Sequence, residues 1–330
     1  MQQQFRMNFR YSNNFFFAKQ MRVAVIDLGT NTSNLVIAGL EEQKLNILYQ
    51  GKEYVRLGDQ SITENIISEA AFERAIGVIR RQIAIASKWN TEKIRIIATS
   101  AVRHASNRRQ FTDTMREISG IETEVIDGER EAMLIYYGVK QALGSLQESS
   151  AILDIGGGSN EIIICENSTI NWKGSYAAGM SRIINTFPIS DPIDSDEIVQ
   201  LEKHFEKVHS EAFDYCNRFG VKTLIGCSGA FNTLADVIDQ IYPDENFRTA
   251  KLIKLQEFEK VFNQIVPSTH DERKIMRGMD PLRTDLIVPA MILSRIFLKK
   301  TSIEKIIQTG YALREGVLYE MLNYGANLRQ

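Results

Sequence analysis

Two segments of the sequence join a carboxylate to a turn of small and polar residues. Asp27 follows the apolar run VAVI and precedes LGTNTSN, and Asp154 follows AIL and precedes IGGGSNE. Such turns expose several backbone N–H groups, which suit phosphate oxygens. Neither matches GxxxxGKS/T or GxGxxG, so a Walker-type or dinucleotide site is not indicated. The predicted phosphate-binding residues are Gly29, Thr30, Asn31, Thr32 and Ser33 in the first turn and Gly156, Gly157, Gly158 and Ser159 in the second.

A third turn of small residues, GCSGA at 226–230, lies between a predicted strand and a predicted helix. Ser228 and Gly229 are its candidate phosphate-binding residues. For any single turn, glycines that only satisfy positive φ angles are an equally good explanation. Two related turns, each preceded by an aspartate, favour phosphate binding.

Asp27 and Asp154 each end an apolar strand, where an ionised carboxylate is costly unless it is paired or binds a cation. Carboxylates that face a phosphate turn favour Mg²⁺, which bridges one or two carboxylates to phosphates and keeps several waters. A turn-capping role for either aspartate is the alternative. We therefore predict Mg²⁺ as the cofactor, with Asp154 as a ligand and Asp27 as a further candidate.

Glu131 and Arg103 are two more residues that could do chemistry. Glu131 lies in the first turn of a predicted helix, in IDGEREAMLIYYGV. There it either stabilises the helix dipole or acts as a general base, and the residues alone favour the dipole role. Arg103 follows ATSAV at the end of a predicted strand, where its guanidinium could grip phosphate or form an ordinary surface ion pair.

The strand-turn-strand hairpin that positions each aspartate occurs twice in the sequence. Shifting the first hairpin by 127 positions aligns Asp27 with Asp154 and Gly29 with Gly156, and the flanking apolar residues match as well. A duplicated hairpin implies two related domains facing one cleft. Apolar periodicity predicts strands at 22–27, 34–40, 44–50, 121–126, 222–226 and 304–307 and in a second hairpin at 150–175, and helices at 68–89, 107–118, 129–142, 194–217, 281–298 and 311–322.

Composition and length exclude several classes of protein. The 330 residues suit two domains, and the formal charge of -2 gives no general attraction for nucleic acid. Three cysteines without CxxC spacing and four histidines without an HExxH pattern argue against disulfides and zinc, and a reducing cytoplasm fits best. No apolar stretch reaches the roughly 18 residues of a membrane span. Residues 1–20 are expected to be a disordered extension.

The motifs DLGTNTSNLVI, ATSAVRHASN, GEREAMLIYYGV, DIGGGSNEII, GCSGA and ALREGVLYEM, taken in order, resemble the exopolyphosphatase and guanosine pentaphosphate phosphohydrolase (Ppx/GppA) family. The resemblance runs from about Met21 to Met321 and is closest to the short, two-domain form. It implies an α/β fold of the actin and sugar kinase superfamily, with two ribonuclease-H-like domains at 21–143 and 144–330. The last helix, about 311–330, would pack back on the first domain, and the protein would be a homodimer.

The resemblance also implies roles for individual residues. Glu131 would be the general base that activates water, against the dipole role that the residues alone favour. Arg130 stands where a glutamate is usual and is expected to lower the pKa of Glu131. Asp154 and Glu161 would bind the metal, and Arg103 would bind phosphate. Asn34 occupies the position of Glu161 in the first hairpin, so the repeat has diverged there.

The expected activity is hydrolysis of the terminal phosphoanhydride of inorganic polyphosphate, with release of orthophosphate. Guanosine pentaphosphate is the nearest alternative substrate. A kinase-like ATPase or a nucleotide sensor of the same superfamily shares the two phosphate hairpins and is the alternative from a different class.

Overall fold

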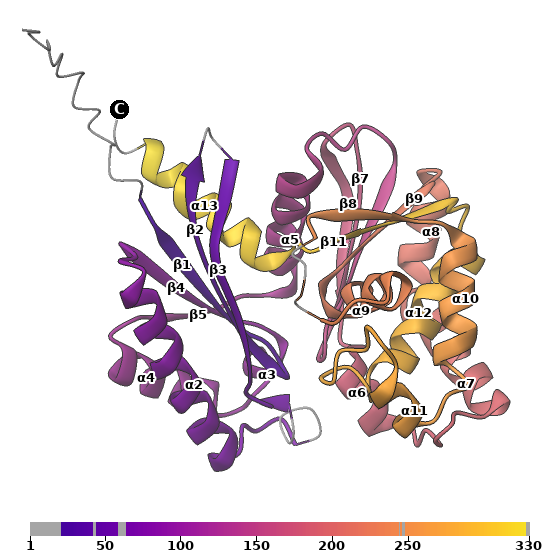
Figure 1. Cartoon of the computed structure of the whole chain (residues 1–330), viewed down its shortest axis with the longest axis horizontal. Helices are drawn as coiled ribbons and strands as arrows, with labels where there is room; N and C mark the ends of the chain where they lie inside the picture. Colours follow the sequence, from indigo (N-terminus) through magenta and orange to yellow (C-terminus); the bar gives the residue numbers. More distant parts are fainter. Residues whose placement is uncertain (1–20, 42–43, 59–63, 244, 246–247, 328–330) are drawn as a thin grey trace, which may run out of the picture.

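The computed structural model describes residues 21–41, 44–58, 64–243, 245 and 248–327, so the predicted extension at 1–20 lies outside the described residues. Within that part of the chain, two sheets with helices packed on them form the molecule (Figure 1). The first sheet has the order β3-β2-β1-β4-β5, with β1 to β3 antiparallel and β4 and β5 parallel to β1. Its strands are β1 (Val23–Leu28), β2 (Thr32–Glu41), β3 (Lys44–Tyr54), β4 (Lys93–Ala98) and β5 (Thr123–Val125).

The second sheet repeats this topology. Its order is β8-β7-β6-β9-β11-β10, in which β6 to β8 are antiparallel, β9 and β11 run parallel to β6, and β10 adds an antiparallel edge. The strands are β6 (Ser150–Ile155), β7 (Asn160–Glu166), β8 (Thr169–Tyr176), β9 (Thr223–Cys227), β10 (Ala250–Ile253) and β11 (Lys305–Thr309). The prediction of two ribonuclease-H-like domains is confirmed.

The two hairpins share a register as well as a topology. Asp27 pairs with Asn34 across β1 and β2, and Asp154 pairs with Glu161 across β6 and β7. The turns close with the same hydrogen bond at 3.0 Å, from the N–H of Gly29 to the Thr32 carbonyl and from that of Gly156 to the Ser159 carbonyl. The internal repeat inferred from the sequence is therefore a structural repeat.

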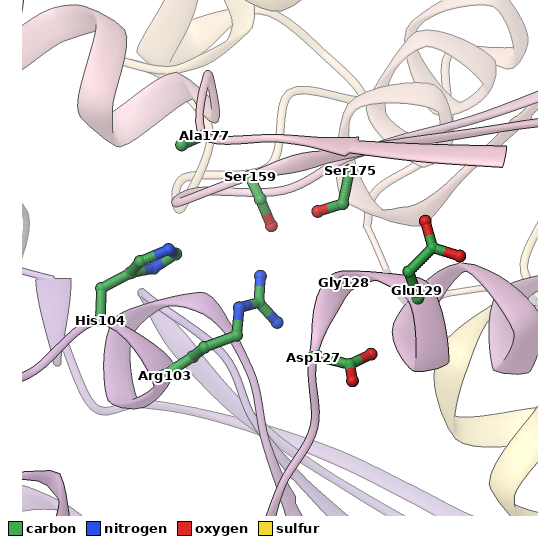
Figure 2. Close-up of a pocket in the computed structure, with 8 residues that line it drawn as sticks. All are labelled: Arg103, His104, Asp127, Gly128, Glu129, Ser159, Ser175 and Ala177. Atoms are coloured by element: carbon green, nitrogen blue, oxygen red, sulfur yellow. The ribbon is translucent and has the colours of Figure 1, made fainter.

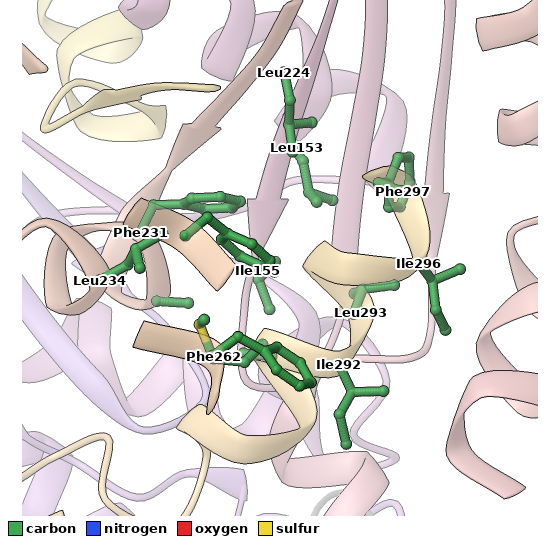
Figure 3. Close-up of a cluster of buried hydrophobic side chains, with 14 of the residues drawn as sticks. Leu153, Ile155, Leu224, Phe231, Leu234, Phe262, Ile292, Leu293, Ile296 and Phe297 are labelled. Carbon is green, nitrogen blue, oxygen red and sulfur yellow. The ribbon is translucent and has the colours of Figure 1, made fainter. Parts of the chain in front are cut away.

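Helices cover the outer faces of both sheets. In the first domain they are α2 (Glu69–Lys88), α3 (Ser100–Arg103) and α4 (Arg108–Ser119). In the second they are α6 (Met180–Thr186), α7 (Ser195–Val208), α8 (Ser210–Arg218), α9 (Ser228–Asp239), α10 (Leu255–Ile265), α11 (His270–Ile275) and α12 (Ile287–Lys300). Alternate residues of β6 and β9, such as Leu153 and Leu224, pack with Phe231, Phe262 and Phe297 of these helices in a buried core (Figure 3).

Two of the helices predicted in the second domain are broken or shortened in the structure, and helices α6, α10 and α11 and strand β10 are not among the predicted elements. The helix expected at 194–217 breaks at His209, which ends α7 and begins α8 with φ −102° and ψ 16°. The helix expected from 281 begins only at Ile287, and the residues before it form turns. This second difference leaves Arg283 in an irregular segment rather than on a helix.

The remaining helices, α5 (Gly128–Leu143) and α13 (Leu313–Asn327), lie between the sheets and pack on each other. Helix α13 follows the second sheet in the chain but contacts β1 and β2, whereas α5 follows the first sheet and contacts β7 and β8 (Figure 1). Each domain thus places a helix against the other, and one apolar cluster joins residues of both sheets. No described helix is both long enough and apolar enough to cross a membrane.

Candidate active site

The two predicted phosphate turns meet at one end of the sheets. A Cβ added to Gly157 would lie 2.8 Å from Asn31 Nδ2, and one added to Gly158 would lie 2.7 Å from Thr30 Oγ1. A side chain at either position would have to displace side chains of the first domain, so the close approach favours glycine. Asn31 also donates a 2.8 Å hydrogen bond from Nδ2 to the Ser181 hydroxyl of the other domain. The repeat therefore brings its two turns face to face across the domain boundary.

Ser33 is an exception among the predicted turn residues. Its hydroxyl is buried and donates at 2.7 Å to Gln82 Oε1 of α2, and Gln82 Nε2 donates back to the Ser33 carbonyl at 3.2 Å. The reason is that β2 already begins at Thr32, and side chains alternate between the faces of a strand. Ser33 holds α2 on the sheet, so its hydroxyl is not available to a phosphate as predicted.

Glu131 and Arg103 lie side by side. Arg103 donates from Nη1 to Glu131 Oε2 at 2.8 Å and to the Ile126 carbonyl at 2.9 Å. Among the described residues its other guanidinium nitrogens have no partner, and Figure 2 shows the group pointing toward Ser159 and Ser175 of the second domain. The Asp127 carboxylate caps α5 through the Arg130 N–H, which holds the first turn of α5 and thereby Glu131 in place.

Four carboxylates share this region, of which Glu131, Asp154 and Glu161 are buried and Asp27 is partly buried. Burial raises the pKa of Asp27 to about 6 and that of Glu131 to about 7, and it raises the pKa values of Asp154 and Glu161 as well. The Arg103 guanidinium opposes the shift at Glu131, while the neighbouring carboxylates add to it. The carboxylates oppose one another's ionisation, and a bound cation would favour their charged forms.

The carboxylates suit a magnesium ion that is held mainly by substrate and water. Asp154 and Glu161 are paired in register and only 7% and 2% exposed, and Glu161 accepts a 2.7 Å hydrogen bond from the Ser175 hydroxyl. In the described part of the chain no three histidine, cysteine or acidic residues converge as an all-protein metal site. Mg²⁺ typically needs only one or two carboxylates beside phosphate oxygens, so the donor set fits it.

The third turn, GCSGA, contributes Ser228 and Gly229 at the start of α9. Ser228 adopts a positive φ of 65°, an unusual conformation for a residue with a side chain, and its hydroxyl is close enough to Asp154 to lower the pKa of that carboxyl. No side chain caps α9, so its first N–H groups are available to an anion. The turn therefore lies beside Asp154 of the second phosphate hairpin.

Arg283 completes this third turn and was missed by the sequence analysis. A Cβ added to Gly229 would lie 2.0 Å from Arg283 Nη2, so the guanidinium rests directly on the glycine. Burial lowers the pKa of Arg283, while Asp280 and Asp154 oppose that shift. Its guanidinium makes no hydrogen bond or ion pair with a described residue. Nothing in the segment DPLRTDL marks this arginine as functional, because it depends on the loop that precedes α12.

Two arginines near the carboxylates have roles that differ from expectation. Arg314, within ALREGVLYEM, is close enough to lower the pKa values of Asp27 and Asp154, and the sequence analysis did not single it out. Arg130 does not act on Glu131 as predicted. It binds Glu320 of α13 at 2.5 Å, and the pKa of Glu131 is raised rather than lowered. Its side chain instead ties α5 to α13.

A cavity of about 430 Å³ opens between the domains at these residues. Arg103, His104 and the start of α5 form one wall, and Ser159, Ser175 and Ala177 form the other (Figure 2). Apart from Ala177, the side chains that line it are polar or charged. Glu131 lies behind Arg103 rather than on the wall. The arrangement suits an anion that contacts both domains.

Comparison with known proteins agrees with this geometry. The structure is similar to the crystal structure of an exopolyphosphatase from Cytophaga hutchinsonii, with 37% identity, a TM-score of 0.87 and coverage of 92% of this chain and 98% of that one. The Aquifex aeolicus member of the Ppx/GppA family has 25% identity and a TM-score of 0.80, over 92% and 98% of the two chains. A bifunctional 3-dehydroquinate synthase/phosphatase of Fusobacterium nucleatum is 27% identical over 296 residues, which are 86% of this chain and 43% of that protein. Residues 36–325 match the model of the Ppx/GppA phosphatase family, and the chain belongs to that family.

Proposed function

We propose that the protein is an exopolyphosphatase, which hydrolyses the terminal phosphoanhydride of inorganic polyphosphate and releases orthophosphate. Membership of the family makes it a hydrolase of anhydride bonds, and the proposal concerns the substrate. The observation that carries it is the cavity beside Arg103 and Glu131, where Arg103, His104, Ser159 and Ser175 offer hydrogen-bond donors from both domains to an anion. The similarity to the Cytophaga hutchinsonii exopolyphosphatase supports the same choice.

In the proposed mechanism the chain's own groups position the terminal phosphate. The backbone N–H groups of the two hairpin turns bind its oxygens, and the Arg103 nitrogens that face the cavity clamp them. Glu131 takes the proton of a water aligned with the bond that breaks, a role suited to a pKa near 7. Phosphoryl transfer depends mostly on such positioning and on charge stabilisation. Arg283 and the start of α9 lie beside Asp154 and offer further donors to the bound terminal phosphate.

Mg²⁺ would be held by Asp154 and Glu161 and would neutralise charge on the phosphates. If so, Mg²⁺ should raise the melting temperature, since a ligand at a hundred times its Kd stabilises the folded state by about 2.7 kcal/mol. Glu161→Gln should abolish most of this increase, whereas Glu206→Gln, on the distant helix α7, should retain it. Thermal unfolding with Mg²⁺ or with a chelator measures the effect. An equal increase in Glu161→Gln would remove Glu161 from the metal site.

The substrate is tested by measuring orthophosphate release from long polyphosphate, tripolyphosphate, guanosine pentaphosphate and ATP, each with Mg²⁺. We expect polyphosphate to give the highest kcat/KM, with no need for an acceptor or a nucleotide. Faster release from guanosine pentaphosphate would make that nucleotide the substrate. Consumption of ATP alone would contradict the proposal and favour a kinase-like ATPase.

A further inference from the structure

A second cavity, of about 490 Å³, lies next to the first. Arg103 and Asp127 line both cavities, so the Arg103 side chain stands between them. The rest of the second wall comes from the first domain alone, from the start of α4, from β5 and from the residue after it. An extended molecule bound in the first cavity could therefore continue past Arg103 along the first domain.

The second cavity is positively charged. Arg108 and Arg109, in the first turn of α4, line it together with Arg103, and the single carboxylate on its wall is Asp127. Within the described residues Arg108 has no ion pair, and Arg109 has only a loose one to Asp113 at 3.8 Å. Most of this positive charge is therefore not neutralised within the protein.

One residue that lines the second cavity, Thr123, has a buried hydroxyl without a hydrogen-bond partner among the described residues. The Thr123 side chain is only 4% exposed. A buried hydroxyl without a partner costs free energy, which a bound acceptor would recover. Thr123 lines the cavity beside the arginines. Its buried hydroxyl would meet a bound oxygen acceptor if the side chain turned toward the cavity.

We propose that the second cavity binds phosphate units of polyphosphate that follow the terminal one, with Arg103 contacting the chain between the two cavities. The inference rests on the exopolyphosphatase function proposed above. A linear chain of repeating anions matches a row of guanidinium groups, which bind phosphate oxygens in pairs. The site would favour long polyphosphate over tripolyphosphate, which is too short to fill both cavities.

The test compares Arg108→Ala/Arg109→Ala with wild type on long polyphosphate and on tripolyphosphate. We expect KM for long polyphosphate to rise about three- to tenfold, as for the loss of two partly screened charge contacts. The values of kcat and of KM for tripolyphosphate should stay within about twofold of wild type, because the first cavity is intact. The effect should shrink as salt is added.

The matched control is Arg80→Ala/Arg81→Ala on α2, which removes two adjacent helical arginines and changes the net charge equally. Its KM for long polyphosphate should remain near that of wild type. Thr123→Val, which keeps the side-chain shape, should raise KM for long polyphosphate without lowering the melting temperature. The inference would be overturned if the two arginine pairs had equal effects. It would also be overturned if KM for long polyphosphate were unchanged in both Arg108→Ala/Arg109→Ala and Thr123→Val.

The measurements distinguish a wrong assignment of the second cavity from a wrong assignment of the substrate. If wild type hydrolyses both polyphosphates and the cavity variants match it, the function stands and the second cavity is not a subsite. If wild type releases phosphate from neither, the function fails. Calorimetric titration with long polyphosphate then tests the cavity, and weaker binding by Arg108→Ala/Arg109→Ala than by the α2 control would support it, whereas equal binding would overturn it.

Discussion

Glu131→Gln should lower kcat for polyphosphate hydrolysis by about two to four orders of magnitude, the usual contribution of a positioned general base. The amide keeps the size of the side chain but cannot accept a proton from water. It can still accept the hydrogen bond that Arg103 donates at 2.8 Å, so Arg103 should stay in place. KM should therefore change little, and the loss should appear in kcat, as steady-state kinetics would show.

Two controls separate catalysis from folding in this variant. Glu117→Gln, on the exposed side of α4, removes the same charge outside the site and should leave kcat within about twofold of wild type. The melting temperature of Glu131→Gln should not fall, because a buried carboxylate whose pKa is raised by burial is replaced by a neutral group. Turnover near the wild-type rate would exclude Glu131 as the base.

Gly316→Ala should destabilise the protein by about 2–3 kcal/mol or more through overpacking. Helices α5 and α13 cross at two glycines, where an added Cβ would meet backbone. At Gly316 it would lie 1.9 Å from the Leu134 carbonyl oxygen, and at Gly138 it would lie 1.9 Å from that of Ala312. Neither carbonyl can move without shifting its helix, so the helices must separate. Thermal unfolding would show the loss.

Gly77→Ala is the matched control, since Gly77 also lies inside a helix, α2. Its added Cβ would meet nothing closer than Arg81 Nη1 at 3.4 Å. Removal of a helical glycine there should stabilise the protein by about 0.5–1 kcal/mol. A stability change of the same sign in both variants would contradict a tight crossing. The tight crossing also accounts for two motif glycines, in YYGV and in REGV.

The duplication could be predicted from the sequence because it depends on local patterns. Asp27 and Asp154 end apolar strands, glycines follow, and the alternation after each turn fixes the hairpin register. Helices with clear apolar periodicity and polar caps, such as α2 after Ser68, were located to within a residue or two. These features need no knowledge of the tertiary structure.

The remaining features depend on contacts between distant segments. Arg283 reaches Gly229 across 54 positions of sequence, and Arg103 reaches Glu131 across 28. A local pattern cannot predict such pairs. Ser33 looked like a turn residue because its hydroxyl suits a phosphate, but the strand alternation turns it toward α2. Apolar periodicity predicts one continuous helix at 194–217, but the helix breaks at His209. The buried Nδ1 of His209 donates to the Phe205 carbonyl at 3.0 Å.

In the proposed reaction, water cleaves the terminal phosphoanhydride of polyphosphate in the cleft between the domains. The most direct measurement follows hydrolysis of long polyphosphate in water enriched in oxygen-18, with Mg²⁺ and without nucleotide, by mass spectrometry of the released orthophosphate. We expect one labelled oxygen in each orthophosphate released from the first turnovers, and almost no labelled orthophosphate from Glu131→Gln over the same time. Absence of orthophosphate, or equal labelled product from Glu131→Gln, would contradict the proposed reaction.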